Sequence, residues 1–186
     1  MKKVLSIIAI AMLSNLANAQ AFENKGNYVN FGFGIDPFSN TIENLYFTNY
    51  KHTKIGPVVL GYERGITEKL GIGRIGVGGI IGQSFESYKN GNYYSKWMNT
   101  SVLVRGAYHF DFNIDKMDVY AGVGAGLTFS GSSKQNDATV YSQSSSVNGE
   151  QYIFAGIRYY FNKNLGVYAE LGEGFMLANG GLVLKF

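Results

Sequence analysis

Apolar side chains recur at every second position in eight segments of this chain, and this period of two is typical of β-strands. In the segment 98–112, for example, Val102 and Val104 lie on one face, whereas Ser101 and Arg105 lie on the other. The eight segments cover residues 27–36, 54–65, 70–85, 98–112, 117–130, 150–161, 165–174 and 179–186. The pattern therefore predicts an all-β protein with eight strands.

The composition of the two faces indicates which of them points inward. One face of each strand holds mainly Gly, Arg, Glu and Tyr, and these residues are poorly suited to fill a dry core. A soluble eight-stranded barrel or sandwich, the alternative, would turn its apolar face inward. The opposite polarity and the even strand count favour an eight-stranded antiparallel up-and-down transmembrane β-barrel whose apolar face meets lipid.

The connections between the segments alternate between short and long. Short turns are predicted around 67–69, 113–116 and 162–164, and long loops at 37–53, 86–96 and 131–149. This alternation is expected for periplasmic turns and extracellular loops, and it places both termini in the periplasm. The loop 131–149 is rich in Ser, Asn and Gln and is predicted to be mobile. Pro57 is compatible with its strand only near the loop end or at a bulge.

The N-terminus has the three parts of a secretory signal peptide. Lys2 and Lys3 are followed by the apolar stretch 4–13 and by a small-x-small cleavage site that ends at Ala19. The apolar stretch is shorter than the roughly 20 residues that a membrane-spanning helix needs. We therefore expect a signal peptide at 1–19, a single barrel domain at 20–186 and export to the bacterial outer membrane.

Charge and cysteine content exclude several kinds of partner. The formal net charge of +3 falls to +1 without Lys2 and Lys3, so nucleic acid is not an expected partner. The chain has no Cys and therefore no disulfide or thiolate metal site. It also has 25 Gly, 14 Tyr and 13 Phe, which favours closely paired β-structure. No cofactor and no metal are expected.

Three strings resemble one known family: 60–65 (LGYERG), 168–172 (YAELG) and 181–186 (GLVLKF). They resemble the small outer-membrane β-barrel domain proteins of Gram-negative bacteria, of the eight-stranded OmpX and OmpA-barrel kind. The resemblance implies contact with outer-membrane lipid, and periplasmic chaperones and the barrel-assembly machinery as partners during biogenesis. It also implies a C-terminal assembly signal made by Gly181, Leu184 and Phe186.

Charged residues of both signs fall on the predicted inner face. They are Asp36, Glu63, Arg74, Arg105, His109, Asp111, Arg158, Glu170 and Lys185. The interior of an eight-stranded barrel is just wide enough for side chains, and an unpaired charge there is costly. We expect these charges to pair and plug the lumen, with Arg105 and Arg158 against Glu63 and Glu170 in an undetermined pairing. A narrow or gated path for ions or small solutes is the alternative.

No catalytic site is expected. Some eight-stranded outer-membrane barrels modify lipid A with a His beside a Ser or a carboxylate, but no His-x-Ser occurs here and nothing orients His52 as a base. The glycine-rich stretch 71–79 lacks the following helix that a phosphate-binding loop requires.

The leading hypothesis is a non-enzymatic outer-membrane protein that displays loops for envelope integrity, adhesion or binding of an extracellular ligand. A small or gated pore is the alternative, and a lipid-modifying enzyme is the third hypothesis. The aromatic residues of the loop 37–53 favour contact with a partner over catalysis.

Overall fold

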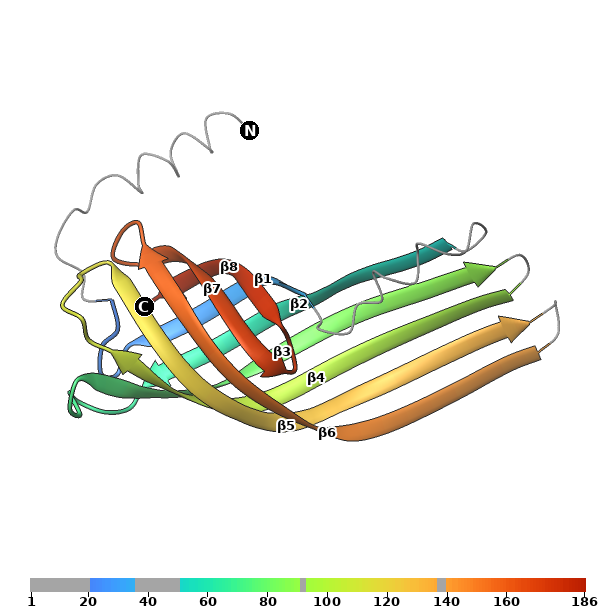
Figure 1. The fold of residues 1–186 in the computed structure, drawn as a ribbon, viewed down its shortest axis with the longest axis horizontal. Coiled ribbons are helices and arrows are strands. Elements are labelled where there is room, and N and C mark those ends of the chain that lie inside the picture. Colours follow the sequence, from blue (N-terminus) through green and yellow to red (C-terminus); the bar gives the residue numbers. More distant parts are fainter. Residues whose placement is uncertain (1–20, 36–50, 91–92, 137–139) are drawn as a thin grey trace, which may run out of the picture.

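The computed structural model describes residues 21–35, 51–90, 93–136 and 140–186, and it shows a closed barrel of eight antiparallel strands (Figure 1). Each strand pairs with its neighbour in the sequence. The strands are β1 (Asn27–Ile35), β2 (Lys51–Gly65), β3 (Gly73–Asn90), β4 (Tyr93–Phe110), β5 (Met117–Asn136), β6 (Val140–Tyr160), β7 (Leu165–Gly174) and β8 (Ala178–Lys185). The predicted eight-stranded antiparallel up-and-down barrel is therefore confirmed. The predicted signal peptide, Asp36 and most of the loop 37–53 lie outside the described residues.

The last strand closes the barrel against the first. β8 pairs with β1 in an antiparallel register that runs from Tyr28 opposite Lys185 to Ile35 opposite Ala178. Gly181 fits this seam because a Cβ atom there would lie 2.1 Å from the carbonyl oxygen of Phe31. The terminal backbone groups also pair, since the amide of Phe186 donates to the carbonyl of Asn27.

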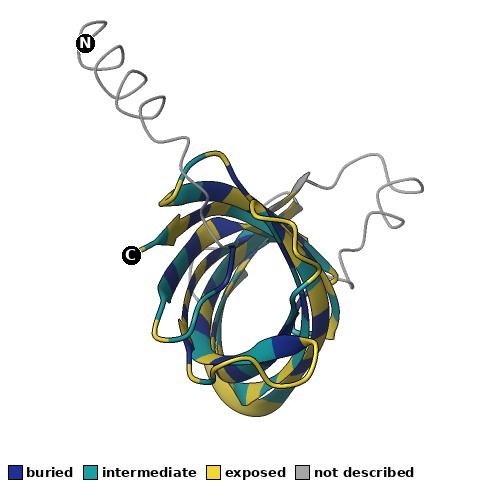
Figure 2. Cartoon of the chain, turned by 90° about the vertical axis from the view of Figure 1, so that its left-hand side faces the viewer, coloured by how far each residue is buried: buried dark blue, intermediate teal, exposed yellow. Residues whose placement is uncertain are grey.

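Side chains alternate between the two faces of the wall, as the bands of colour in Figure 2 show. In β4, Val102 and Val104 are exposed on the outside, whereas Leu103 and Arg105 are buried inside. Every strand contributes exposed large apolar residues, so the barrel has an apolar exterior. The predicted assignment of the two faces is therefore correct along the barrel wall.

The ladder between β2 and β3 is interrupted at Gly56 and Pro57. The register shifts between Ile55 and Val58, and Gly56 adopts a φ of 94°. Because proline cannot donate a backbone hydrogen bond, it fits at such an interruption and not within a continuous central ladder. Of the two positions that the sequence allowed for Pro57, the loop end or a bulge, the structure shows the bulge.

The predicted long loops at 86–96 and 131–149 are wrong. β3 and β4 remain paired up to Asn90 opposite Tyr93, and β5 and β6 up to Asn136 opposite Val140. Together with the start of β2, these strands extend well beyond β1, β7 and β8 as a curved sheet (Figure 1). We call this part of the sheet, residues 51–55, 85–90, 93–98, 131–136 and 140–149, the outer sheet.

The sequence does not predict the outer sheet because it lacks apolar alternation. Residues 142–149 are all exposed, and most of them are Ser, Asn or Gln. Where both faces of a strand meet solvent, hydrophobic periodicity disappears although the backbone ladder continues. A polar, Ser-rich stretch here forms strand and not loop.

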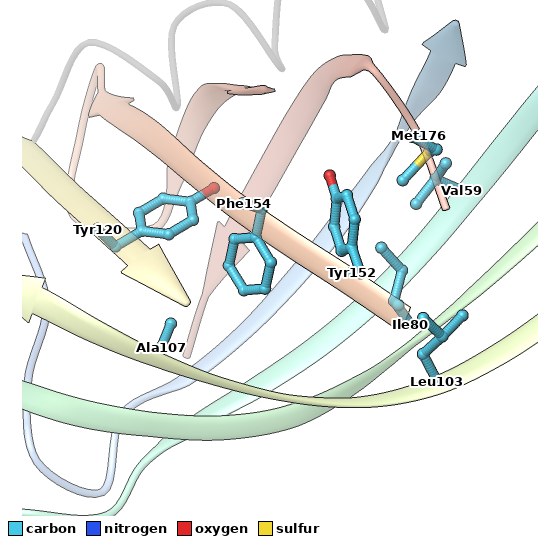
Figure 3. Packing of buried hydrophobic residues seen from close by; sticks show 8 residues of the cluster. All are labelled: Val59, Ile80, Leu103, Ala107, Tyr120, Tyr152, Phe154 and Met176. Carbon is cyan, nitrogen blue, oxygen red and sulfur yellow. The ribbon is translucent and has the colours of Figure 1, made fainter. Parts of the chain in front are cut away.

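The short β7–β8 connection points back into the barrel. Met176 is fully buried and packs with Val59, Ile80 and Leu103 in a cluster that also contains Tyr152 (Figure 3). Phe175 packs against the same cluster. The sequence predicts only a short outer loop here, whereas the structure shows that the loop supplies an apolar layer across the lumen.

Glycine at inward positions allows neighbouring strands to pack closely. Substitution of a closely packed glycine and of an unpacked one can test this. A Cβ at Gly126 would lie 2.0 Å from the carbonyl oxygen of Val102, whereas a Cβ at Gly149 would meet nothing within 4 Å. We expect Gly126→Val to lower the free energy of unfolding by at least the roughly 1–3 kcal/mol typical of overpacking. We expect Gly149→Val to leave it nearly unchanged. Urea unfolding of the refolded protein in detergent micelles measures both, and equal midpoints would contradict the packing described.

Candidate functional site

The lumen contains a network of charged side chains centred on His109. Its Nδ1 lies 2.9 Å from Asp118 Oδ1, and its Nε2 lies 2.5 Å from Glu63 Oε1. Arg158 connects the two carboxylates, with Nη2 2.5 Å from Glu63 Oε2 and Nη1 3.3 Å from Asp118 Oδ2. All four side chains are buried, and they come from β2, β4, β5 and β6. The network therefore spans the barrel interior.

The partners of His109 determine the number of protons in this network. Both ring nitrogens face carboxylate oxygens, and a carboxylate only accepts hydrogen bonds. Satisfying both contacts requires an imidazolium, or one protonated carboxyl group beside a neutral ring. In the first case, two cations and two anions balance each other, which is the arrangement expected where an uncompensated charge is costly.

A second ion pair lies in the same lumen. Arg105 and Glu170 form two parallel hydrogen bonds of 3.2 and 2.8 Å. Glu170 also accepts hydrogen bonds from the hydroxyls of Tyr120 and Tyr152 at 3.0 and 2.9 Å, and from Asn179 Nδ2 at 3.2 Å. A bidentate ion pair with these additional hydrogen bonds is held firmly in one geometry. This second pair is also neutral.

Aromatic rings enclose both guanidinium groups. Arg158 lies 4.6 Å from the ring centroid of Tyr120 and 5.3 Å from that of Tyr28. Arg105 lies 3.8 Å from the ring centroid of Phe154. Cations over ring faces gain electrostatic stabilisation that increases when water is excluded. The rings and the ion pairs therefore form one continuous filling of the lumen.

Phe22 closes the network on the side of the short turns. Its ring stacks on His109 with centroids 3.5 Å apart and on Tyr28 with centroids 4.7 Å apart. The segment is held in place because the Glu23 amide donates to the Tyr28 hydroxyl and Lys185 pairs with Glu23. The alternating pattern does not reveal this role of Phe22, because nothing in it marks a residue that precedes the first strand.

The structure brings together five of the nine predicted lumen charges. Arg105 pairs with Glu170, Arg158 pairs with Glu63, and His109 joins the second pair. Asp118 belongs to the same network but was missing from the predicted set, although its inward position follows from the alternation. Asp118 lies in the predicted segment 117–130, so the missing prediction was its part in the charge network and not its place in a strand.

Three other predicted charges lie apart from this network. Arg74 and Lys69 both pair with Asp111 at 3.2 Å beside the short turn, and Lys185 pairs with Glu23. Partial burial opposes ionisation of Asp111, but the hydrogen bond from Lys69, the Asn113 amide and the charge of Arg74 hold its pKa below the usual value. These groups form a rim at the end of the barrel and do not enter the lumen network.

The remaining predicted residues are placed as follows. His52 lies in β2, but its side chain is outside the described set. Leu184 and Phe186 of the predicted assembly signal are exposed on the outside, and Gly181 lies at the β1–β8 seam. Within the described chain, no group of three or more His, Cys, Asp or Glu residues is arranged to hold a metal ion. No helix in the same residues is long and apolar enough to cross a membrane.

Comparison with known proteins gives similarity only at the level of structure. No protein-family model matches the chain, and no curated protein matches its sequence. The N-terminal β-barrel domain of OprF from Pseudomonas aeruginosa is 20% identical, with 88% of this chain and 98% of that chain covered and a TM-score of 0.43. Ail, the attachment invasion locus protein of Yersinia pestis, is 13% identical, with 88% and 97% covered and a TM-score of 0.48.

Removing one charged partner from the buried network should strongly destabilise the barrel. Glu63→Gln keeps the side-chain shape but removes the negative charge that faces Arg158 and His109. We expect a loss of about 3–5 kcal/mol in the free energy of unfolding, the range for breaking a buried pair. Asp111→Asn, at the partly exposed rim outside this network, should cost about 1 kcal/mol or less. Urea unfolding in micelles compares the two, and a smaller loss for Glu63→Gln would contradict the network's structural role.

Proposed function

We propose that this chain is an integral outer-membrane β-barrel protein without enzymatic activity. Its barrel is closed to solutes and carries the outer sheet as a surface for contacts outside the cell. The observation that carries this proposal is the combination of an apolar exterior with a lumen filled by paired charges. We expect an extracellular ligand to meet the outer sheet or the barrel mouth beneath it.

The exterior supports a membrane location. On β4 and β7, Val104 is 72% exposed and Leu171 is 67% exposed, and each other strand also presents exposed large apolar side chains. Soluble monomers rarely expose contiguous apolar surface on this scale, whereas a barrel that spans a bilayer requires it. Aromatic residues such as Tyr108 and Phe110 lie near the short turns, where a membrane interface would prefer them.

The filled lumen favours display over conduction. A solute path would require the Arg105–Glu170 and Arg158–Glu63 pairs to separate, and apolar Met176 and Leu103 lie across the lumen as well. Separating buried pairs leaves uncompensated charges in a medium that solvates them poorly. A small or gated pore is therefore the second candidate and not the first.

The outer sheet supports a role in surface contacts. Its outward side carries a groove of about 740 Å³ lined in part by Ile55, Phe85, Tyr94 and Met98. Aromatic and Met residues are enriched where proteins contact partners, whereas the Ser-rich strands around the groove keep the sheet soluble. A long paired sheet also presents these residues on a more rigid support than a loop would.

Membrane insertion can be tested on the barrel exterior. We expect Val104→Arg, in the middle of the apolar exterior, to cost about 2–4 kcal/mol for a cation at the bilayer midplane. It should therefore reduce the folded yield in lipid vesicles. Gln143→Arg, exposed in the outer sheet, is the matched control and should insert like the wild type. Electrophoretic mobility without heating measures the folded fraction, and equal yields would contradict the proposed membrane span.

A single-channel conductance measurement distinguishes a protein that displays a surface for contacts from a protein that transports solutes. We expect the refolded wild-type protein to show no steady single-channel current in a planar bilayer. The double variant Arg105→Ala/Glu170→Ala removes both charges of one pair and leaves neither one uncompensated, so we expect it to fold. Because the Arg158–Glu63 pair and the apolar residues Met176 and Leu103 still cross the lumen, we expect this variant to show no steady current either. Steady current through the wild type would instead favour the pore and give the lumen charges a role in selectivity.

A further inference from the structure

A polar cavity of about 280 Å³ lies inside the barrel wall, on the side of the outer sheet. Its lining combines hydroxyl and amide groups with one carboxylate and one aromatic ring. The residues that line it include Ser84, Asn99, Ser101, Thr128, Ser130, Glu150 and Phe175. We call this cavity the cup. It lies above the apolar layer that Met176 and Leu103 form, so it is separate from the ionic network.

The strand register arranges the polar groups of the cup in two adjacent rows. Ser84 is opposite Asn99, and Asn99 is in turn opposite Ser130, which forms one row across β3, β4 and β5. Ser101 is opposite Thr128 in the next row. All of these positions have the inward parity of their strands, so the hydroxyl and amide groups converge on one space.

Only part of this polar surface is paired within the protein. Ser101 and Thr128 share a hydrogen bond of 2.7 Å, and the Thr128 hydroxyl donates to Glu150 Oε2 at 3.0 Å. In the described chain, Ser84, Asn99 and Ser130 have no side-chain hydrogen bond. Because an Asn side chain can both donate and accept, this row offers several donors and acceptors at close spacing.

Phe175 provides an apolar wall beside these groups. Its ring packs edge-on against Tyr152 with centroids 5.7 Å apart, which fixes its position. Gly82 makes room for it, because a Cβ atom there would lie 2.3 Å from Cζ of Phe175. A flat aromatic surface next to convergent polar groups is typical of pockets that orient a small ligand.

We propose that the cup binds one sugar residue, with its hydroxyls on the Asn99 and Glu150 sides and its C–H surface against Phe175. The volume lies just below the roughly 300–1,000 Å³ of small-molecule sites, which suits a single ring and not a longer chain. The lining contains no Lys or Arg that could bind an anionic ligand. It contains one carboxylate, whereas a Ca²⁺ site usually has several, so the lining does not suit Ca²⁺ either. Many hydroxyls around one space match a polyhydroxylated ligand better than an apolar one.

This inference deepens the proposed display function, because it names a ligand class for the barrel mouth. The sugar could be a free monosaccharide or the terminal residue of a longer glycan, and both present the same ring to the cup. Failure of sugar binding would leave the membrane insertion of the barrel unaffected, so the two proposals can fail separately.

The experiment is an NMR titration of the refolded mature protein in phosphocholine-headgroup micelles, which avoid the sugar headgroups of maltoside detergents. The probes are methyl α-D-glucoside, methyl α-D-mannoside, N-acetylglucosamine and maltotriose, with CaCl₂ and cyclohexanol as chemically different controls. We expect saturable amide shifts at cup residues for at least one sugar. Asn99→Ala and Glu150→Gln should weaken that binding at least tenfold. Thr100→Ala and Gln151→Ala, outward neighbours on the same strands, should not.

The outcomes separate the possible occupants of the cup. Shifts with a methyl glycoside would show that a single ring suffices, and shifts with maltotriose alone would indicate the end of a glycan; both support the proposal. Saturation with CaCl₂ or cyclohexanol but with none of the sugars would overturn it. The same holds for the absence of saturable shifts with every probe, which would mean that the cup contains only water, and for equal binding by Asn99→Ala and wild type.

Discussion

The structure depends on charge balance inside a space that only side chains can fill. An eight-stranded wall leaves an interior too narrow for bulk water, so each charge that points inward must find its partner across the barrel. His109 is central to this charge balance, because it contacts carboxylates from two other strands and a ring from the N-terminal segment. The strand register, the inward glycines and the aromatic rings all have to be compatible with that arrangement.

The barrel could be predicted from the sequence because its wall separates lipid-compatible from polar side chains at most positions. The alternation of Ser101, Val102, Val104 and Arg105 gives strand type, face and approximate bounds together. For the same reason the inward charges could be named in advance, including four that form the two ion pairs. Which arginine pairs with which glutamate depends on strand tilt and side-chain length, and a one-dimensional pattern contains neither.

What the sequence did not reveal has physical causes of two kinds. The outer sheet has solvent on both faces, so its strands lack the apolar signal that reveals the others, and 131–149 resembles a loop in composition alone. Phe22 and Met176 belong to segments outside the alternating pattern, and only the closed barrel shows that both point into it. Side chains from irregular segments thus seal the lumen of a regular structure, one near the short turns and one near the cup.

The unequal lengths of the strands also determine how the barrel mouth is shaped. β1, β7 and β8 are short, whereas β2 to β6 continue far beyond their ends (Figure 1). The described strands therefore do not form a complete ring above the cup: their wall is tall on the side of β2 to β6 and low on the side of β1, β7 and β8 (Figure 1). A ligand longer than one sugar ring, with its end in the cup, would therefore gain contacts with the inner face of β2 to β6 and none with the three short strands.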